Sequence, residues 1–252
     1  MLSLVQDAVI LIITLGAALL FMAILNRLWP HEKRSVNNDL IGWQLTIVGT
    51  TYAVILGFML YTVWTTYGAA QLNSDLEANA LRNVYHLAEG LPEPQRTQLK
   101  QYSRDYAEAV INRDWPQMAC GEIPEGSHTI SQAMIHTVQK VKVDSPTTAV
   151  YLDHTFTALT TLSEHRRTRI LEVVYKLPPI FWAVLIVGAI VTIASAATFG
   201  ARTPLLHAFQ VTSFTLLVTL VLLAIGDVNL PFQGWIHVDN YAFVRARQFM
   251  TD

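Results

Sequence analysis

Charged side chains are absent from four long stretches of this chain of 252 residues. No Asp, Glu, Lys or Arg occurs in residues 8–26, 40–74, 177–201 and 203–226, which are 19, 35, 25 and 24 residues long. Each stretch can hold a helix that crosses about 30 Å of hydrocarbon, which takes roughly 20 apolar residues. The other 149 positions hold all 36 charges, a density that is usual for a soluble domain. This distribution excludes a wholly soluble globule and predicts a membrane protein with several spans.

Other features that would indicate a function are also scarce. Cys120 is the single cysteine, so an intramolecular disulfide is excluded. A net charge of −2 and a pI near 6.4 give no electrostatic reason to expect a nucleic-acid partner. The sequence has no GxSxG, no Walker loop and no GxGxxG. We therefore expect neither an enzyme nor a nucleic-acid-binding protein.

The histidines outside the charge-free stretches do not follow a metal-binding pattern. They show neither HExxH spacing nor an accompanying CxxC. Those in the soluble segment 75–176 are His86, His128, His136, His154 and His165. A zinc site assembled by the fold stays open as an alternative, but ordinary polar positions are favoured. We expect no metal and no cofactor.

The charge-free stretches also lack the groups that move protons or sense voltage. No ionisable residue lies at the centre of any of them, which argues against a proton relay or a voltage sensor. His207 lies near the start of the last stretch, and we expect its side chain at the membrane interface. Residues 1–7 include an acid and no basic residue, which favours a retained first helix over a cleaved signal peptide.

Four membrane helices are predicted from these stretches and from the residues that flank them. Their approximate limits are Leu4–Trp29, Leu40–Ala70, Pro178–Gly200 and Pro204–Gly226. The last two are separated by only a few residues, so we expect them to form an antiparallel hairpin. The chain then divides into membrane helices one and two (1–74), a helical soluble domain (75–176), membrane helices three and four (177–226) and an amphiphilic tail (227–252).

The second charge-free stretch is longer than a bilayer needs. Apolar residues continue to recur every three or four positions beyond it. They are Ala69, Leu72, Leu76, Ala80, Val84 and Leu87. Gly90-Leu91-Pro92 then provides a stop signal. We predict one helix from about residue 40 to residue 89.

Residues 93–176 have the composition of a soluble helical domain. Pro94 opens a helix that we expect to stop at Trp115-Pro116, and Gly121–Ser127 is the expected loop. Ser145-Pro146 fits an N-cap followed by proline at the first helical position. No alternating run that would form a sheet is present. We therefore predict an all-α membrane protein with four transmembrane helices and a helical soluble domain.

The second membrane helix is distinctive because threonine is interleaved with large apolar residues. Thr50, Val54 and Phe58 are four residues apart and lie on one face of the helix. One interpretation is packing against neighbouring helices, since threonine hydroxyls bond back to their own helix. The other is a pore in which apolar rings form a constriction. The pattern alone favours packing.

A basic run, Glu164 to Arg169, precedes the third membrane helix. Such a run is most often a solvated helix face, and this is our first expectation. A second interpretation is contact with anionic lipid headgroups. A third is a cationic vestibule that concentrates anions near a pore mouth, formed by Arg166, Arg167 and Arg169.

Several short motifs follow one another in a fixed order along residues 45–240. They are Gly49-Thr-Thr-Tyr-Ala-Val-Ile-Leu-Gly-Phe58 with Trp64 and Tyr67, Glu77-Ala-Asn-Ala-Leu81, Leu91-Pro92, Arg169 with Leu177-Pro178 and Trp182, and Pro231-Phe232-Gln233-Gly234. In this order they resemble the bestrophin-like family of bacterial membrane proteins. Leu56-Gly57-Phe58 also resembles, more distantly, part of the pore helix of the bestrophin ion channels.

The resemblance implies an assembly and a function. Bestrophins are helical pentamers with four membrane helices per subunit, and the second helix lines a narrow neck. By position, the neck would contain Thr50, Val54 and Phe58, and Tyr61 would also line the pore. The preference therefore changes to a bestrophin-like ion channel, a homo-oligomer and specifically a pentamer, in the bacterial inner membrane. Its partners would be membrane lipids and small inorganic ions. The alternative is a non-conducting scaffold or sensor that recruits a partner through its helical domain.

Two departures from the channels limit what the resemblance carries over. Val54 is aliphatic where the channels have an aromatic neck residue, and Thr50 is polar, so this neck would be wider and less apolar. The acidic run that binds calcium in the channels is replaced here by Gln233-Gly-Trp-Ile-His-Val-Asp239. Only Asp227 and Asp239 remain nearby, so we do not expect calcium gating.

Two sets of basic residues predict opposite orientations under the positive-inside rule. The links between membrane helices contain Arg27, Lys33, Arg34 and Arg202. The other set consists of Arg166, Arg167, Arg169, Lys176, Arg245 and Arg247. The distribution of charge therefore does not decide the orientation, and the resemblance places the soluble domain in the cytoplasm.

Overall fold

The computed structural model describes residues 4–250, which form helices joined by short loops and contain no strand. Residues 1–3 and 251–252 lie outside the described residues. They contain the start of the first predicted segment (1–74) and the end of the last one (227–252). The chain divides into two compact units. We call residues 4–65 and 176–229 the membrane unit, and residues 66–175 and 230–250 the soluble unit. The predicted all-α fold is confirmed.

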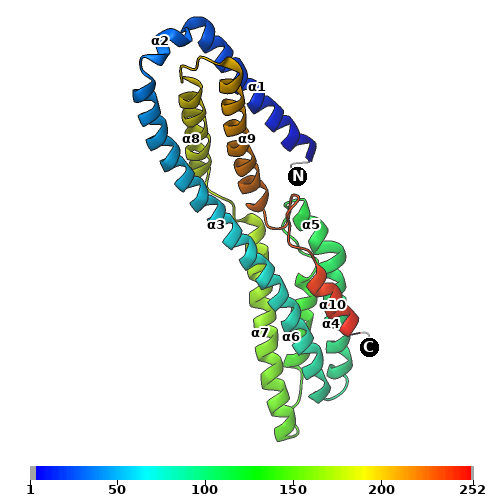
Figure 1. The fold of residues 1–252 in the computed structure, drawn as a ribbon. Helices are drawn as coiled ribbons and strands as arrows, with labels where there is room; N and C mark the ends of the chain where they lie inside the picture. Colours follow the sequence, from blue (N-terminus) through cyan, green and yellow to red (C-terminus); the bar gives the residue numbers. More distant parts are fainter. Residues whose placement is uncertain (1–3, 251–252) are drawn as a thin grey trace. The chain divides into compact units, whose positions relative to one another are not determined.

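Four helices of the described chain are long and apolar enough to cross a membrane, as predicted. They are α1 (Leu4–Leu28), α3 (Asn38–Leu87), α8 (Pro179–Ala197) and α9 (Pro204–Val228). In Figure 1, α8 and α9 form the expected hairpin and α1 lies along α9. The Thr219 hydroxyl donates to the Thr14 hydroxyl over 3.2 Å, and Met22 shares a buried cluster with Val211. From the first pair to the second, the residue number rises by eight on α1 and falls by eight on α9, so the two helices are antiparallel.

An aromatic ring packed on a glycine joins α3 to α8. Tyr52 is buried, and its hydroxyl donates to the carbonyl of Leu185 over 2.8 Å. A Cβ at Gly188 would lie 2.5 Å from the Tyr52 ring, so only glycine lets the ring approach the α8 backbone this closely. Close packing of this kind holds membrane helices together because lipid is as apolar as the protein surface.

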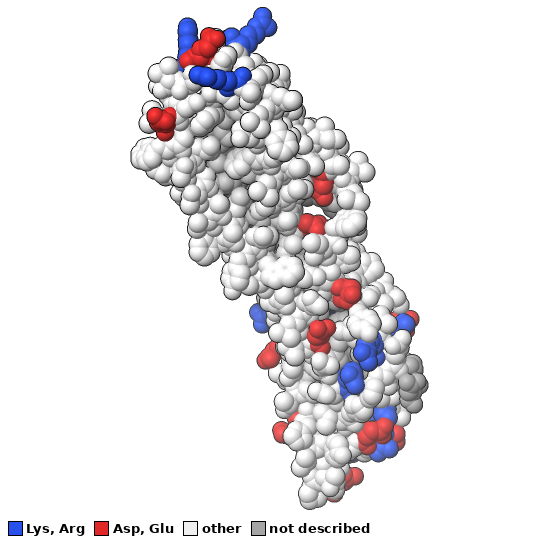
Figure 2. Space-filling view, in the orientation of Figure 1, with Lys and Arg blue, Asp and Glu red and all other residues white. Residues whose placement is uncertain are grey.

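A buried arginine closes the link between α1 and α3. The link contains a short helix, α2 (His31–Ser35), and Lys and Arg side chains gather at this end of the membrane unit in Figure 2. Arg34 is 0% exposed; its Nη1 donates to the Ala197 carbonyl over 3.1 Å and its Nη2 donates to Asn26 Oδ1. Both acceptors lie at helix C-termini, whose partial negative charge stabilises a buried cation. Arg34 therefore connects α1 to the α8–α9 hairpin.

The predicted helix from about residue 40 to residue 89 is confirmed. Helix α3 covers Asn38–Leu87, and a 3-10 turn, η1 (Ala88–Gly90), follows it directly. The apolar repeat noted in the sequence is only partly buried in the soluble unit: Ala80 and Val84 are buried. Leu72 and Leu76 are 59% and 40% exposed, whereas Glu77 is fully buried. The buried positions include Ala70, Ser74, Glu77, Leu81, Val84 and Ala88. They form a regular three-four repeat that an apolar pattern misses because it includes Ser74 and Glu77.

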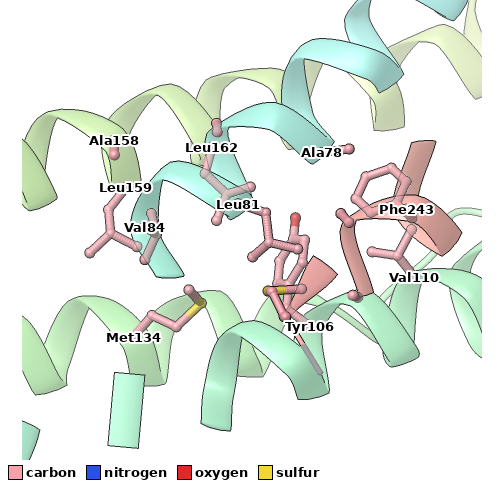
Figure 3. Close-up of a cluster of buried hydrophobic side chains, with 14 of the residues drawn as sticks. Ala78, Leu81, Val84, Tyr106, Val110, Met134, Ala158, Leu159, Leu162 and Phe243 are labelled. Carbon is pink, nitrogen blue, oxygen red and sulfur yellow. The ribbon is translucent and has the colours of Figure 1, made fainter. Parts of the chain in front are cut away.

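The soluble unit adds five further α-helices around this face of α3. They are α4 (Gln95–Ala109), α5 (Trp115–Ala119), α6 (His128–Gln139), α7 (Pro146–Val174) and α10 (Tyr241–Phe249). The core centres on Leu81, Tyr106 and Leu162, all fully buried (Figure 3). The predicted loop over 121–127 is non-helical, and Ser145 Oγ caps α7 by accepting from the Thr148 N–H over 3.1 Å, as expected.

Two local predictions are wrong. The helix that begins near Pro94 does not stop at Trp115-Pro116, because α4 continues through a π-helical turn, η2 (Val110–Asp114), into α5. The π-turn changes the hydrogen-bonding pattern just before Pro116, so the missing N–H of proline falls in the first turn of α5. The side chain of His207 faces the protein interior instead of the membrane interface: it is 4% exposed, with Nε2 3.2 Å from the Ala196 carbonyl oxygen.

The segment after α9, which the sequence sets apart as a tail, packs into the soluble unit. Phe232, Val238 and Phe243 belong to its buried core. The Val238 N–H donates to the Pro231 carbonyl over 2.7 Å, which closes a loop around Gly234 at φ +83°. Trp115 Nε1 donates to the Val238 carbonyl over 3.1 Å. The tail is therefore an integral part of this unit.

Candidate pore-lining face and buried ion-pair network

One face of α3 in the membrane unit is left uncovered. Val54, Phe58 and Tyr61 are 53%, 65% and 67% exposed, and Thr50 is exposed as well. Their spacing of three and four residues puts all four on the same side of the helix. The opposite side is buried through Tyr52, Leu56 and Val63. The structure thus brings the four predicted pore-lining residues together on one free face of α3.

This face has a shallow recess at its apolar part. Val54, Gly57, Phe58 and Tyr61 line an open hollow of about 450 Å³. No atom lies within 4 Å of the position that a Cβ of Gly57 would take. Large side chains therefore alternate with an unfilled position along the face.

The threonines near this face satisfy their hydroxyls locally. Thr46 Oγ1 donates to the Gly42 carbonyl over 2.9 Å, and Thr62 Oγ1 donates to the Phe58 carbonyl over 2.8 Å. Both side chains are exposed. Their exposure agrees better with contact to lipid, another subunit or a pore than with burial between helices, which the sequence pattern alone favours.

The soluble unit buries an ion pair between α3 and α7. Arg169 Nε donates to Glu77 Oε2 over 2.7 Å, and Arg169 Nη2 donates to Glu77 Oε1 over 3.0 Å. Both side chains are 0% exposed. The Tyr106 hydroxyl donates to Glu77 Oε1 over 2.7 Å. This two-point geometry is the strongest form of carboxylate–guanidinium contact.

A second carboxylate, Asp114, extends the network to the π-turn and the loop before α6. Arg169 Nη2 donates to Asp114 Oδ2 over 3.2 Å. The Ser127 hydroxyl donates to Asp114 Oδ2 over 2.6 Å, and its N–H donates to Oδ1 over 3.2 Å. Arg166 Nε donates to Ser127 Oγ over 2.9 Å. One arginine therefore links α3, α7 and the segment around η2.

The electrostatics of this network keep its protons in place. Burial by itself lowers the pKa of Arg169, but the charge of Glu77 and its hydrogen bonds raise that pKa above its usual value. Burial, reinforced by the charge of Glu77, raises the pKa of Tyr106 well above its usual value. Neither group releases its proton near neutral pH, so the network acts as a fixed cross-link.

A further carboxylate on α7 behaves differently. Glu172 Oε2 accepts from Asn73 Nδ2 over 3.4 Å, while Asn73 Oδ1 lies 2.7 Å from His165 Nδ1. Burial raises the pKa of Glu172 to about 7, and the charge of Glu77 adds to this effect. The hydrogen bond from Asn73 and the charge of Arg169 act in the opposite direction. Glu172 therefore changes its charge near neutral pH.

The structure corrects the predicted cationic vestibule. Arg169 is fully buried, with its guanidinium 5.7 Å from the centre of the Trp115 ring, so it presents no charge to solvent. Arg166 is half-buried and bonded to Ser127. Arg167 is exposed. The run is an amphipathic helix segment in which one arginine belongs to the core.

Sequence reasoning missed Glu77 and Asp114 as partners of Arg169. A usable signal exists for Glu77, since it falls within a three-four repeat of small and apolar residues where an acid requires a buried partner. Asp114 gives no such signal, because it is 55 residues from Arg169 and lies in an irregular turn. Within residues 4–250, no group of three or more His, Cys, Asp and Glu side chains is placed to hold a metal ion.

The four apolar helices and the helical soluble unit define a multi-span helical membrane protein. A family model described as the Bestrophin-like domain matches residues 12–243. The chain belongs to the Bestrophin-like family. No curated protein matches the chain.

Solved structures with a similar fold include those of a bacterial bestrophin homolog from Klebsiella pneumoniae. An isoleucine-to-threonine variant of it has a TM-score of 0.74 at 11% identity, covering 96% of this chain and 99% of that chain. A leucine-to-threonine variant has a TM-score of 0.73 at 11% identity, covering 96% and 98%. The structure solved by Zn-SAD phasing has a TM-score of 0.71 at 12% identity, covering 95% and 98%. At this identity the likeness establishes the fold.

Proposed function

We propose that this chain is a subunit of an oligomeric ion channel that conducts small ions through a central pore lined by α3. The observation that carries the proposal is the free face of α3, on which Thr50, Val54, Phe58 and Tyr61 lie in a row. Membership of the Bestrophin-like family supports it. In a symmetric assembly around an axis facing α3, each of these side chains would form a ring.

Conduction would depend on the width of the apolar rings. Val54 and Phe58 offer no oxygen ligands, so ions would pass by partial dehydration, and a narrow apolar ring closes by losing its water. Gly57 precedes Phe58, and no atom fills the position of its missing side chain. A rotation of α3 that turned Phe58 away from the axis and Gly57 toward it would widen the pore.

The family suggests how the chain assembles and where it is located. We propose a homo-oligomer, with five subunits as the expected number, in the bacterial inner membrane and with the soluble unit in the cytoplasm. Membrane lipids and small inorganic ions would be its partners. Arg167 remains a candidate for a cationic vestibule, because its side chain is exposed.

Planar-bilayer recording of the purified oligomer tests this function. Wild type should carry a current, and Phe58→Ala should raise its conductance several-fold because the ring becomes wider. Leu217→Ala is the matched control, since Leu217 is 62% exposed on α9 and lies outside the proposed pore. Absence of current from wild type, Phe58→Ala and Val54→Ala, in protein that is folded and oligomeric, would contradict the channel and favour the scaffold or sensor.

A further inference from the structure

A groove of about 670 Å³ lies between α1, α8 and α9 of the membrane unit. Its lining runs from Ile10 to Phe21 on α1 and from Trp182 to Ala194 on α8. At ~1.5 Å of rise per residue, both segments are roughly 16–18 Å long. The hydrocarbon core of a bilayer is about 30 Å thick, so the groove is about as long as one leaflet is deep.

The groove offers almost nothing to water. Its lining is apolar apart from Thr14 and Thr219. Thr14 Oγ1 donates to the Leu11 carbonyl over 3.0 Å, and Thr219 Oγ1 donates to Thr14 Oγ1 over 3.2 Å. Because both hydroxyls have protein partners, a water molecule would find too few hydrogen bonds to occupy the space. Hydrocarbon is the occupant that such a lining fits.

Two carboxylates lie at one end of the groove. In the antiparallel register set by the Thr14–Thr219 pair, Asp7 on α1 is level with Gly226 and Asp227 on α9. Gly226 lines the groove, and both acids are half-buried. Negative charge at this end repels an anionic headgroup and attracts one that carries an ammonium group. The same end holds Trp182, whose ring lies 3.6 Å from the Cβ position of Gly226.

We propose that this groove binds one acyl chain of a phospholipid with an ammonium headgroup, such as a phosphatidylethanolamine. The chain would lie along α1 between α8 and α9, with its headgroup end beside Trp182 and the two acids. Tryptophan at this level suits the boundary between headgroups and hydrocarbon. The site does not depend on conduction, because none of its residues belongs to the proposed pore face.

Quenching of Trp182 fluorescence by brominated lipids tests the site. The full-length protein is reconstituted in vesicles in which a rising share of the lipid carries bromine near the headgroup end of the acyl chain. The emission of Trp182 is the difference between wild type and Trp182→Phe. We expect brominated phosphatidylethanolamine to quench this emission at a several-fold lower share than brominated phosphatidylglycerol.

Matched variants connect the quenching to the groove. Ala17→Phe places a ring in the groove from an exposed position on its wall, and it should remove the selective quenching. Ala8→Phe is the control, because Ala8 is exposed on the opposite side of α1. Asp7→Asn combined with Asp227→Asn should abolish the preference between the two lipids while quenching persists.

Two results would overturn the proposal. Equal quenching by both lipids that Ala17→Phe leaves unchanged would mean ordinary lipid contact without a dedicated site. Absence of quenching, together with dissociation of the oligomer in Ala17→Phe, would mean that a neighbouring subunit fills the groove.

Discussion

The two units use the same helix in opposite ways. In the soluble unit α3 buries a charged residue, Glu77, against Arg169. In the membrane unit it leaves Val54 and Phe58, two apolar residues, uncovered. Burying a charge destabilises a protein unless the charge is paired and hydrogen-bonded. An uncovered apolar side chain costs nothing against lipid, and in the proposed assembly it would form part of the pore wall. In this chain, residue type alone therefore does not tell whether a side chain is buried or exposed, or whether its role is structural or functional.

Breaking the buried pair should have the largest effect. Arg169→Met leaves Glu77 and Asp114 buried without their cation, and we expect it to destabilise the soluble unit by about 3–5 kcal/mol. Denaturant unfolding of the purified protein, followed by circular dichroism, measures this change. Arg167→Met is the control: Arg167 is exposed two residues away, and its change should stay within about 0.5 kcal/mol. Equal unfolding curves for the two variants would mean that the ion pair does not hold the unit together.

Two truncations on α3 contrast its buried and uncovered parts. Leu81→Ala removes a fully buried side chain from the core of the soluble unit and should cost about 2–5 kcal/mol. Phe58→Ala removes a side chain that is 65% exposed, so it should cost much less and act on conductance instead. Unfolding and bilayer recordings on the same two preparations measure both effects. A loss of stability in Phe58→Ala as large as that in Leu81→Ala would place Phe58 in a packed interface.

Two glycines of the membrane unit make a smaller test of its packing. A methyl group at Gly188 would collide with Tyr52, so Gly188→Ala should cost about 1–3 kcal/mol. Gly16→Ala is the control, because no atom lies within 4 Å of the Cβ position of Gly16 on α1. Alanine favours helix over glycine by up to about 1 kcal/mol, so the control should be neutral or stabilising. Thermal unfolding in detergent distinguishes the two, and equal melting temperatures would argue against close packing of α3 on α8.

The smallest expected effect is a pH dependence of the soluble unit. The pKa of Glu172 is raised from 4.5 to about 7 in the folded chain, so folding favours its protonated form. The resulting stability is fully present below pH 4.5 and is lost as pH rises through 7. The groups that face it are Asn73 and Glu77 on α3 and Arg169 on α7. Melting temperatures at pH 5 and pH 8 should differ less in Glu172→Gln than in wild type; an unchanged difference would assign the dependence to another group.

The membrane helices and the face of α3 could be predicted from the sequence because both depend on local patterns. Long stretches without charge show the spans, and the four-residue spacing of Thr50, Val54 and Phe58 puts them on one side of a helix. The stop signal at Gly90-Leu91-Pro92 locates the end of α3. Whether this face lines a pore depends on other subunits, which no local pattern describes.

The buried network could not be predicted because it depends on pairing between distant residues. Glu77 and Arg169 are 92 residues apart. The repeat around Glu77 points to a buried partner, but nothing in the basic segment around Arg169 identifies that residue as the partner. Asp114 reaches Arg169 only because a π-turn, which has no clear sequence signal here, carries it inward. The packing of the tail likewise depends on contacts between distant residues, such as the hydrogen bond from Trp115 to Val238 and the burial of Phe232 and Phe243 in the core.

Cysteine accessibility during conduction tests whether α3 lines the pore. Single cysteines are placed at 50, 54 and 58, and at 52 and 56 on the buried side, in a Cys120→Ser background, and a water-soluble thiol reagent is added to open channels. We expect the reagent to block the current of Val54→Cys and Phe58→Cys, and to leave that of Leu56→Cys unchanged. Block at Leu56→Cys, with none at Val54→Cys and Phe58→Cys, would contradict a pore lined by this face of α3.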